Sequence, residues 1–260
     1  MIKDMFFAFG KGVQSNAILF MIDKGVLPAP EIIFHSNMGV TEDYLLPYFT
    51  EYSMPVIERI CQRFGTKYQE SDLDFQSAVE KRVITPFWFA GADGKPALVT
   101  RRSCTKTFKV DPSNLLIPKR AWCKVVLGIS LDEVRRAREW QELSWGRMRE
   151  NWYPLIEHGL TRADCIELIV SYGMPVPPKS ACDICPFSAK RRLIERLATD
   201  STLYGRIKKI EANWHEKPKH AHKFLTVFLR DLPSQEQAIK LMSVYAKEID
   251  NSGGCNVCEY

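Results

Sequence analysis

The apolar positions in the first sixty residues predict alternating strands and helices. Met5 to Phe9 is a short continuous apolar run typical of a buried strand, and residues 31–35 form a second run. Between them, apolar residues recur at helical spacing over residues 16–24, and Gly25 is suited to end that helix. Strand, helix, strand is the start of a parallel sheet with right-handed crossovers.

Further elements continue this pattern. Thr41, followed by two acids, is expected to cap a helix that runs toward Phe64 with a break near Pro55. Residues 124–129 indicate another strand, followed by a helix capped by Ser130. Residues 161–172 form an amphipathic helix with Gly173 at its end, whereas residues 65–100 are irregular, with an aromatic loop at 87–94.

After residue 187 the sequence pattern no longer predicts alternating strands and helices. From residue 188 onward it is helical and charged, with a last helix expected over residues 235–249 and a short polar tail that we expect to be mobile. We therefore predict an α/β Rossmann-like nucleotide-binding domain over residues 1–187. A helical C-terminal region is expected over residues 188–260.

Composition narrows the class of protein. The chain has 260 residues and is 45% hydrophobic, which suffices for one large domain with a helical appendage. Its N-terminal apolar run is too short for a membrane span or a signal peptide, so we expect a cytoplasmic protein. The net charge of +5 permits anionic substrates or nucleic acid without demanding either.

Eight cysteines are many for a protein of a reducing compartment, where clustered cysteines more often bind metals than form disulfides. Three of them lie within predicted elements and are expected to be buried small hydrophobes: Cys61, Cys123 and Cys165. The other five are Cys104, the pair Cys182 and Cys185 in C-x-x-C spacing, and the tail pair Cys255 and Cys258.

A glycine-rich turn joins the first strand to the first helix and is the first candidate site. Its residues are Phe9, Gly10, Lys11, Gly12, Val13, Gln14 and Ser15. Backbone N–H groups at a helix N-terminus favour phosphate or sulfate, Lys11 adds charge and Ser15 a hydroxyl. A tight turn that merely requires glycine is the alternative. Its place at the carboxyl end of a strand favours binding.

Two more strand ends are candidates. Residues 35–39 follow the second strand, and backbone groups there could contact an adenine edge; His35 alone is more simply a histidine satisfied by hydrogen bonds. Gly128, Ser130 and Arg135 follow the later strand and could hold an anion. A capped surface helix with solvated arginines explains this second group equally well. The stretch 214–223 could contact nucleic acid, although a solvated loop is favoured.

The cysteines suggest a metal or cluster site. Cys182, Cys185 and Cys104 would supply three thiolates, which suit zinc or iron–sulfur clusters. A structural zinc needs four protein ligands, and the tail pair could supply the fourth or act as a redox pair. The basic residues around Cys104 favour its thiolate and can hold an anion: Arg101, Arg102, Lys106 and Lys109.

Taken in order, six segments resemble the phosphoadenosine-phosphosulfate (PAPS) reductase family of the PP-loop (adenine nucleotide α-hydrolase-like) superfamily, and look closest to its phage and bacterial reductase-like branch. The segments are Phe9–Ser15, Phe34–Gly39, Arg102–Thr105 with Lys109 and Pro112, Gly128–Glu133, Trp152–Ile156 and Pro178–Phe187. The resemblance implies a Rossmann-like fold, an adenine nucleotide at the first loop, and sulfur chemistry.

The resemblance also assigns roles, with two departures. In assimilatory adenylylsulfate (APS) reductases, a double cysteine and a later C-x-x-C hold a four-iron cluster, and here Ser103 replaces one cysteine. A C-terminal cysteine attacks the sulfate sulfur in the reductases, which points to Cys255 or Cys258. PP-loop enzymes that split ATP carry an aspartate where this chain has Gln14, so a carboxylate that could help hold magnesium is missing.

Three hypotheses follow. The first is a PAPS or APS reductase-like enzyme with a [4Fe-4S] cluster, and the second an ATP- and magnesium-dependent thiolation or DNA phosphorothioation-type enzyme. The third is a non-catalytic nucleotide-binding protein with structural zinc. Expected partners are the nucleotide, a redox or sulfur-donor protein and, under the second hypothesis, nucleic acid. The predicted catalytic residues are Cys255, Cys258 and Lys109, and the predicted metal ligands Cys104, Cys182 and Cys185. The nucleotide site is predicted at residues 9–15, His35, Ser36, Asn37, Gly39, Arg101, Arg102, Gly128, Ser130 and Arg135.

Overall fold

The structure is a computed structural model. It describes residues 2–71, 88–90, 96–98, 105–115, 122–137, 140–143, 147–183, 185, 190–215, 226–228 and 233–252. The chain divides into two compact units: Met1–Phe75 with Thr105–Ser180, and Gln76–Cys104 with Ala181–Tyr260. The expected domain boundary after residue 187 stays a prediction.

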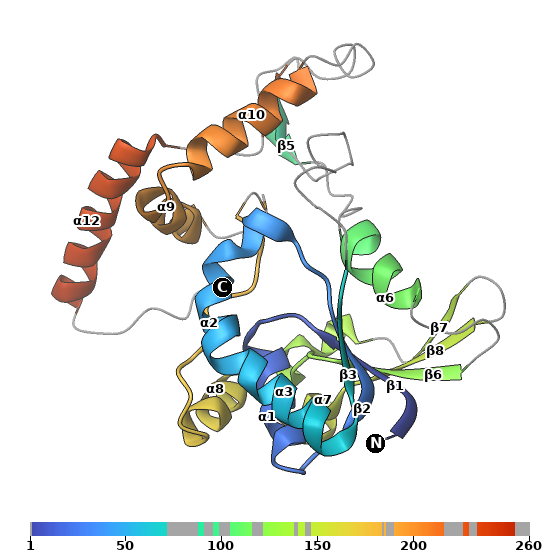
Figure 1. The fold of residues 1–260 in the computed structure, drawn as a ribbon. Coiled ribbons are helices and arrows are strands. Elements are labelled where there is room, and N and C mark those ends of the chain that lie inside the picture. Colours follow the sequence, from blue (N-terminus) through green and yellow to red (C-terminus); the bar gives the residue numbers. More distant parts are fainter. Residues whose placement is uncertain are drawn as a thin grey trace. The chain divides into compact units, whose positions relative to one another are not determined.

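A six-stranded sheet forms the centre of the first unit, in the order β3-β2-β1-β6-β8-β7 (Figure 1). Its strands are β1 (Ile2–Phe9), β2 (Pro30–His35), β3 (Lys67–Glu70), β6 (Trp122–Leu127), β7 (Trp140–Leu143) and β8 (Arg147–Trp152). All neighbouring pairs are parallel except β7 with β8. The predicted α/β fold with a parallel sheet is therefore confirmed. The strand order reverses at β1, which lies between β2 and β6 and marks the topological switch point.

Alternation along β1 sets the two faces of the sheet. Met5, Phe7 and Phe9 are buried in one core together with residues of α1 (Val13–Asp23), α3 (Met54–Phe64), α7 (Pro154–Glu157) and α8 (Arg162–Ser171). Phe6 belongs to a smaller cluster on the opposite face, with residues of β2 and β6. Helix α1 buries nine of its eleven residues, because it is packed between the sheet, α3 and α8.

Several elements of the structure differ in detail from those predicted from the sequence. The segment after β2 starts as a 3-10 helix, Gly39–Leu45, whose N-cap is Met38, so the predicted Thr41 cap is wrong. It continues through α2 (Leu46–Tyr48) and a π-helical turn, Phe49–Ser53, into α3. Ser130 does precede a helical segment, but this is a short 3-10 helix, Leu131–Arg136. The predicted helix at 161–172 is confirmed as α8, which Thr161 caps with a capping box and Gly173 follows at φ +74°.

The second unit contains a small sheet and three described helices. The sheet is antiparallel in the order β5-β4-β9, from Pro96–Leu98, Trp88–Ala90 and Thr226–Phe228. Strand β4 lies inside the expected aromatic loop, so that expectation is wrong for these three residues. Helix α9 (Lys190–Thr199) packs against α12 (Gln235–Ser252), and α10 (Leu203–His215) contacts β9. These helices confirm the predicted helical C-terminal region.

Two short helical segments precede β6 in the first unit: a π-helical turn, Lys106–Val110, and α6 (Asp111–Leu115). Phe108 is buried at 2% exposure, and Lys109 lies beside it in the turn. Across the described ranges, none of the helices has the length and apolar character needed to cross a membrane.

Candidate nucleotide-binding site

The turn between β1 and α1 has an unusual backbone at Lys11. This residue has φ +56°, in the left-handed region that lysine rarely adopts. Its side chain is nonetheless buried, and Nζ lies 4.5 Å from the centroid of the Phe49 ring. Such a backbone persists only where the surroundings hold it. The turn is therefore a fixed structure and not merely a flexible connection.

The carbonyl groups of this turn all accept hydrogen bonds from side chains. Ser180 Oγ donates to Gly10 O at 2.7 Å. Asn16 Nδ2 donates to Lys11 O at 3.2 Å and to Gly12 O at 3.0 Å. Because the first N–H groups of a helix have no acceptor within it, the polar groups that α1 offers a ligand here are donors. That arrangement favours an anion.

Asn16 and Ser180 were not among the predicted site residues. Asn16 is fully buried, and Ser53 Oγ donates to its Oδ1 at 2.7 Å. The available sequence signal is weak, because Asn16 follows two polar residues at the start of an apolar helical run. Once buried, its amide needs several hydrogen-bond partners. Ser180 lies 170 residues from Gly10 along the chain, and no local pattern indicates such a contact.

The loop after β6 packs directly on the start of α1. A Cβ atom added at Gly128 would lie 3.1 Å from the backbone nitrogen of Ser15 and 3.3 Å from the carbonyl carbon of Gln14. Gln14 Nε2 donates to Ser130 Oγ at 3.4 Å and to Glu133 Oε2 at 3.3 Å. The structure thus brings together the predicted residues from β1 and β6 at the switch point, where open α/β sheets bind ligands.

Arg135, the predicted phosphate clamp, is exposed on the 3-10 helix that follows Ser130. Ser130 itself is fully buried and interacts with Asp132, whose pKa is lowered by hydrogen bonds from Ser130 and from the Arg162 N–H against the opposing effect of burial. The anchor of this loop is therefore the serine, and a role for Arg135 stays a prediction.

His35 ends β2 beside Phe9. Its Nδ1 is 3.0 Å from Phe9 O, which makes Nδ1 the protonated nitrogen, while Nε2 is buried without a hydrogen-bond partner among the described residues. Burial, and next the charge of Lys11, lower the pKa of His35 to about 3. The imidazole is therefore neutral at physiological pH.

Charged residues gather at the ends of β2 and β3. Lys109 Nζ lies 3.2 Å from Glu42 Oε1, and the Glu42 side chain is only 3% exposed. Ser36 Oγ donates to Lys109 O at 3.4 Å, which ties the π-helical turn to the end of β2. Burial lowers the pKa of Lys11, opposed chiefly by the nearby charges of Glu42 and Glu70. The predicted Lys109 therefore does lie near the predicted loop after β2.

Asn37 and Gly39 follow in the same loop. The Asn37 N–H donates to Ser71 Oγ at 3.0 Å, and the Ser71 N–H donates to His35 O at 3.0 Å. Gly39 opens the 3-10 helix. These contacts close the loop after β2 against the end of β3, so backbone groups here have fixed positions.

The cysteine pair forms a turn in the second unit. Cys185 N donates to Cys182 O at 3.0 Å, and both residues are half-buried. Two thiols on one tight turn fit a soft metal or a cluster. Cys104, Cys255, Cys258, Arg101 and Arg102 lie outside the described residues, as do residues 216–223 of the candidate nucleic-acid stretch. Within the described ranges, no group of three histidine, cysteine or acidic residues is placed to hold a metal ion.

The remaining cysteines behave largely as the sequence predicts. Cys123 and Cys165 are fully buried, and burial raises the pKa of their thiols to about 11 and about 12. Cys61 is half-buried on α3. None of the three is poised to act as a thiolate at neutral pH.

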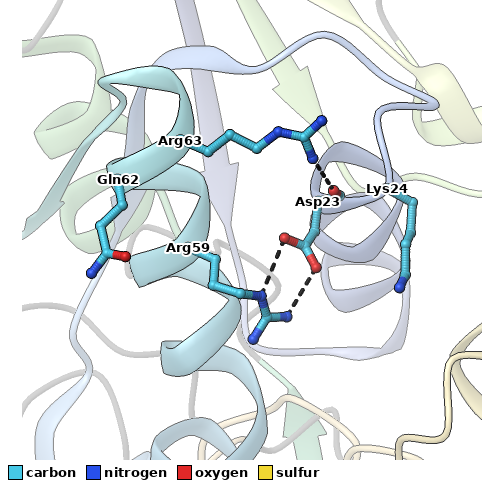
Figure 2. A pocket seen from close by; sticks show the side chains of 5 residues that line it. All are labelled: Asp23, Lys24, Arg59, Gln62 and Arg63. Carbon is cyan, nitrogen blue, oxygen red and sulfur yellow. Dashed lines mark hydrogen bonds and ion pairs between the residues drawn. The ribbon is translucent and has the colours of Figure 1, made fainter.

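An open pocket lies at the C-terminal ends of α1 and α3 (Figure 2). Arg59 binds both carboxylate oxygens of Asp23, at 3.4 and 2.9 Å, and Arg63 donates to Asp23 O at 3.2 Å. Lys24 and Gln62 complete the lining. Cations at helix C-termini are stabilised by the helix dipole, which accounts for this cluster. The pocket contains none of the predicted nucleotide-binding residues.

Comparison with known proteins adds little to what the sheet topology shows about the fold. No family model matches the chain, and no curated protein matches it. Among solved structures, a match is found to the phosphoadenylyl-sulfate (PAPS) reductase from Candida auris, in a phosphate complex. The two are 14% identical, and the match covers 68% of this chain and 76% of that chain with a TM-score of 0.41. A likeness at this level carries no argument, and the α/β fold class rests on the sheet described above.

Proposed function

We propose that the chain is an adenine-nucleotide-binding enzyme of sulfur chemistry that acts like PAPS or APS reductases. One observation carries the nucleotide site: the carbonyls of Gly10, Lys11 and Gly12 are all engaged, at the point where the Gly128 loop packs on α1. The loop therefore presents donors to a phosphate at the switch point of the sheet. The reductase assignment itself is supported by the six resembling segments.

Each part of the nucleotide would occupy one strand end. The phosphate groups would bind the first turn of α1, with Ser15 and Ser130 beside them. The adenine would lie against the loop after β2, whose backbone is fixed by Asn37 and Ser71. Lys109 would face the sulfate end together with Arg101 and Arg102. A thiolate of Cys255 or Cys258 would then attack the sulfate sulfur and form a cysteine S-sulfonate. The bond between that sulfur and the oxygen it shares with the phosphate would break, and the nucleotide would leave carrying that phosphate.

The cysteine turn is proposed to hold an iron–sulfur cluster through Cys182, Cys185 and Cys104, with zinc as the alternative metal. Support comes from the tight turn that places two of these residues together. When bound, a cluster with three protein thiolates supplies one open iron for sulfide or substrate. Ser103 stands where related reductases have a further cysteine, so the fourth ligand is not expected to come from that position.

One contact favours the second candidate, an ATP-dependent thiolation or phosphorothioation-type enzyme. Glu133 Oε2 lies 3.3 Å from Gln14 Nε2, so a carboxylate stands next to the position where ATP-splitting relatives of the family carry aspartate. A carboxylate in that place could serve magnesium bound to ATP. A nucleic acid acceptor would then be expected, and DNA binding at low salt tests it.

The deciding experiment is a nucleotide binding panel on anaerobically purified protein, with PAPS, APS and ATP plus magnesium. We expect a sulfonucleotide to bind at least tenfold more tightly than ATP, a difference of about 1.4 kcal/mol. Preference for ATP would replace the first proposal with the second. Failure to bind any of the three would contradict both. Iron and acid-labile sulfide in the same preparation would exclude the structural-zinc hypothesis.

A further inference from the structure

Two arginines of α9 hold the segment that contains the cysteine pair. Arg192 NH2 donates to Ala181 O at 2.8 Å. Arg196 Nε and NH2 donate to the two carboxylate oxygens of Asp183, each at 3.0 Å. The two arginines are four residues apart and so lie on one face of the helix. Residues directly before and between the cysteines are thus fixed to α9.

The ion pair between Asp183 and Arg196 is bidentate and largely buried, and we call it the Asp183–Arg196 fork. The Asp183 side chain has no exposure, and that of Arg196 is 20% exposed. A bidentate guanidinium–carboxylate pair fixes orientation as well as distance. Removing one partner of a buried ion pair is strongly destabilising, because it leaves an uncompensated buried charge. The Asp183 backbone therefore has one orientation, and the Cys182–Cys185 turn is built on it.

Arg196 is itself held by a second carboxylate. Asp200 Oδ2 lies 3.7 Å from Arg196 NH2 and 2.8 Å from Arg206 NH2. Asp200 also accepts from the N–H and hydroxyl of Thr202, at 2.9 and 2.8 Å. The network therefore continues from the cysteine turn through α9 to the start of α10. It gives Arg196 little freedom to turn away from Asp183.

We propose that the Asp183–Arg196 fork, with Arg192, is a positioning device that shapes the Cys182–Cys185 turn for its metal or cluster before that group arrives. The proposal rests on the proposed function in one respect, that this pair binds a soft metal. A ligand pair ordered in advance loses less conformational freedom on binding. Hydrogen-bonded groups behind metal ligands commonly change metal affinity by about 10- to 100-fold.

A purely structural role for the fork predicts something different. If it only fastened α9 to the preceding chain, its removal would lower the unfolding midpoint but leave metal affinity unchanged in protein that stays folded. The test therefore measures affinity under conditions where circular dichroism shows every variant to be folded.

The experiment uses the reduced full-length chain in a Cys255→Ser, Cys258→Ser background, so that the tail contributes no thiolate. Cobalt(II) is titrated and followed by its thiolate charge-transfer absorption. The variants are Asp183→Asn, Arg196→Lys and the double change Asp183→Asn with Arg196→Gln. Arg191→Gln is the matched control, because Arg191 lies on the same helix and pairs with Glu195 at the surface.

We expect Asp183→Asn and the double variant to bind cobalt about 10- to 100-fold more weakly, and Arg196→Lys to fall between them and the parent. Arg191→Gln should stay within about twofold, as expected for an exposed ion pair. Without metal, amide hydrogen exchange across residues 181–185 should become faster in Asp183→Asn and in the double variant, and should stay unchanged in the Arg191→Gln control. If Asp183→Asn does not fold, the double variant, which leaves neither charge unpaired, and Arg196→Lys decide the question.

Two results would overturn the proposal: parental cobalt affinity in the folded double variant, or unchanged exchange across the turn. If the parent protein binds no cobalt, the metal role in the proposed function fails instead. The exchange measurement then still decides whether the fork positions the turn. The two failures are therefore distinguishable.

Discussion

Five buried polar side chains lie at or beside the turn proposed to bind the nucleotide. Lys11, Ser15, Asn16, His35 and Ser130 are all at most 8% exposed. Burying such groups costs free energy unless they are bonded, and the hydrogen bonds of Ser15, Asn16 and Ser130 hold the turn after β1 and the loop after β6. Asn16 bonds through both its amide nitrogen and its oxygen. The buried polar groups therefore fix the turn after β1, which is the proposed nucleotide-binding loop.

His35 makes stability depend on pH. Its folded pKa is about 3, against an ordinary value of 6.5, so between these values the unfolded chain binds a proton that the folded chain does not. Stability from this residue is complete above pH 6.5 and falls by about 1.4 kcal/mol per pH unit as the pH drops toward 3. Urea unfolding at pH 7.5 and pH 5 should show this loss in the parent protein.

The comparison variant is His35→Asn, which keeps an N–H near Phe9 O but does not titrate. We expect its free energy of unfolding to change less between pH 7.5 and pH 5 than that of the parent, by on the order of 2 kcal/mol. Equal changes in the two proteins would show that His35 is not the residue responsible.

At the scale of elements, the close approach of the β6 loop to α1 makes Gly128 sensitive to substitution. Gly128→Ala places a Cβ 3.1 Å from the Ser15 backbone nitrogen, so the first turn of α1 has to move. We expect a loss of about 1–3 kcal/mol in unfolding free energy and at least tenfold weaker nucleotide binding. Chemical denaturation and isothermal titration calorimetry measure the two effects.

Gly205→Ala is the matched control for this change. Gly205 lies within α10, and a Cβ there meets nothing within 4 Å. Replacing this glycine, in the first turn of α10, with alanine should stabilise the protein by up to about 0.5–1 kcal/mol and leave nucleotide binding unchanged. Unaltered affinity in Gly128→Ala would argue against a ligand at this strand end.

The elements that sequence patterns predicted well are those with local apolar signals. Runs such as Met5–Phe9 and Val125–Leu127 mark buried parallel strands, and the glycine turns follow them directly. Strands β3 and β8 were missed because their sequences, Lys67–Glu70 and Arg147–Trp152, are mostly polar. In β8, Arg149 is buried and bonds to Asn114 and Asn151, a pattern that hydrophobic periodicity cannot detect.

In the candidate site, too, local sequence patterns predicted some residues and not their distant partners. Glycine spacing at strand ends pointed to Gly10, Gly12 and Gly128, and the structure brings these loops together where a parallel sheet requires it. The partners that hold the loops are distant in sequence: Glu133 lies 119 residues from Gln14, and Ser180 lies 170 residues from Gly10. Such pairs follow only from the completed topology.

At the scale of the whole molecule, nucleotide binding should stabilise both loops at the proposed site together. A ligand at about 100 times its Kd stabilises the folded state by about 2.7 kcal/mol. We expect hydrogen exchange to slow at residues 10–16 and at residues 128–133 together, because both loops flank one site. Protection of only one loop would contradict a site at the switch point.

The bond between Ser180 and Gly10 also has a consequence for biosynthesis. Strand β1 has β2 on one side but lacks its other neighbour, β6, until residue 127 has been made, and Gly10 O lacks its donor until residue 180 has been made. At translation rates of about 5–20 residues per second, that interval of 170 residues lasts about 10–30 s. During this time Gly10 O lacks its donor, and until residue 127 has been made the central strand also lacks one neighbour. A ribosome pause before residue 127 would therefore prolong the exposure of the unfinished strand to chaperones and to aggregation.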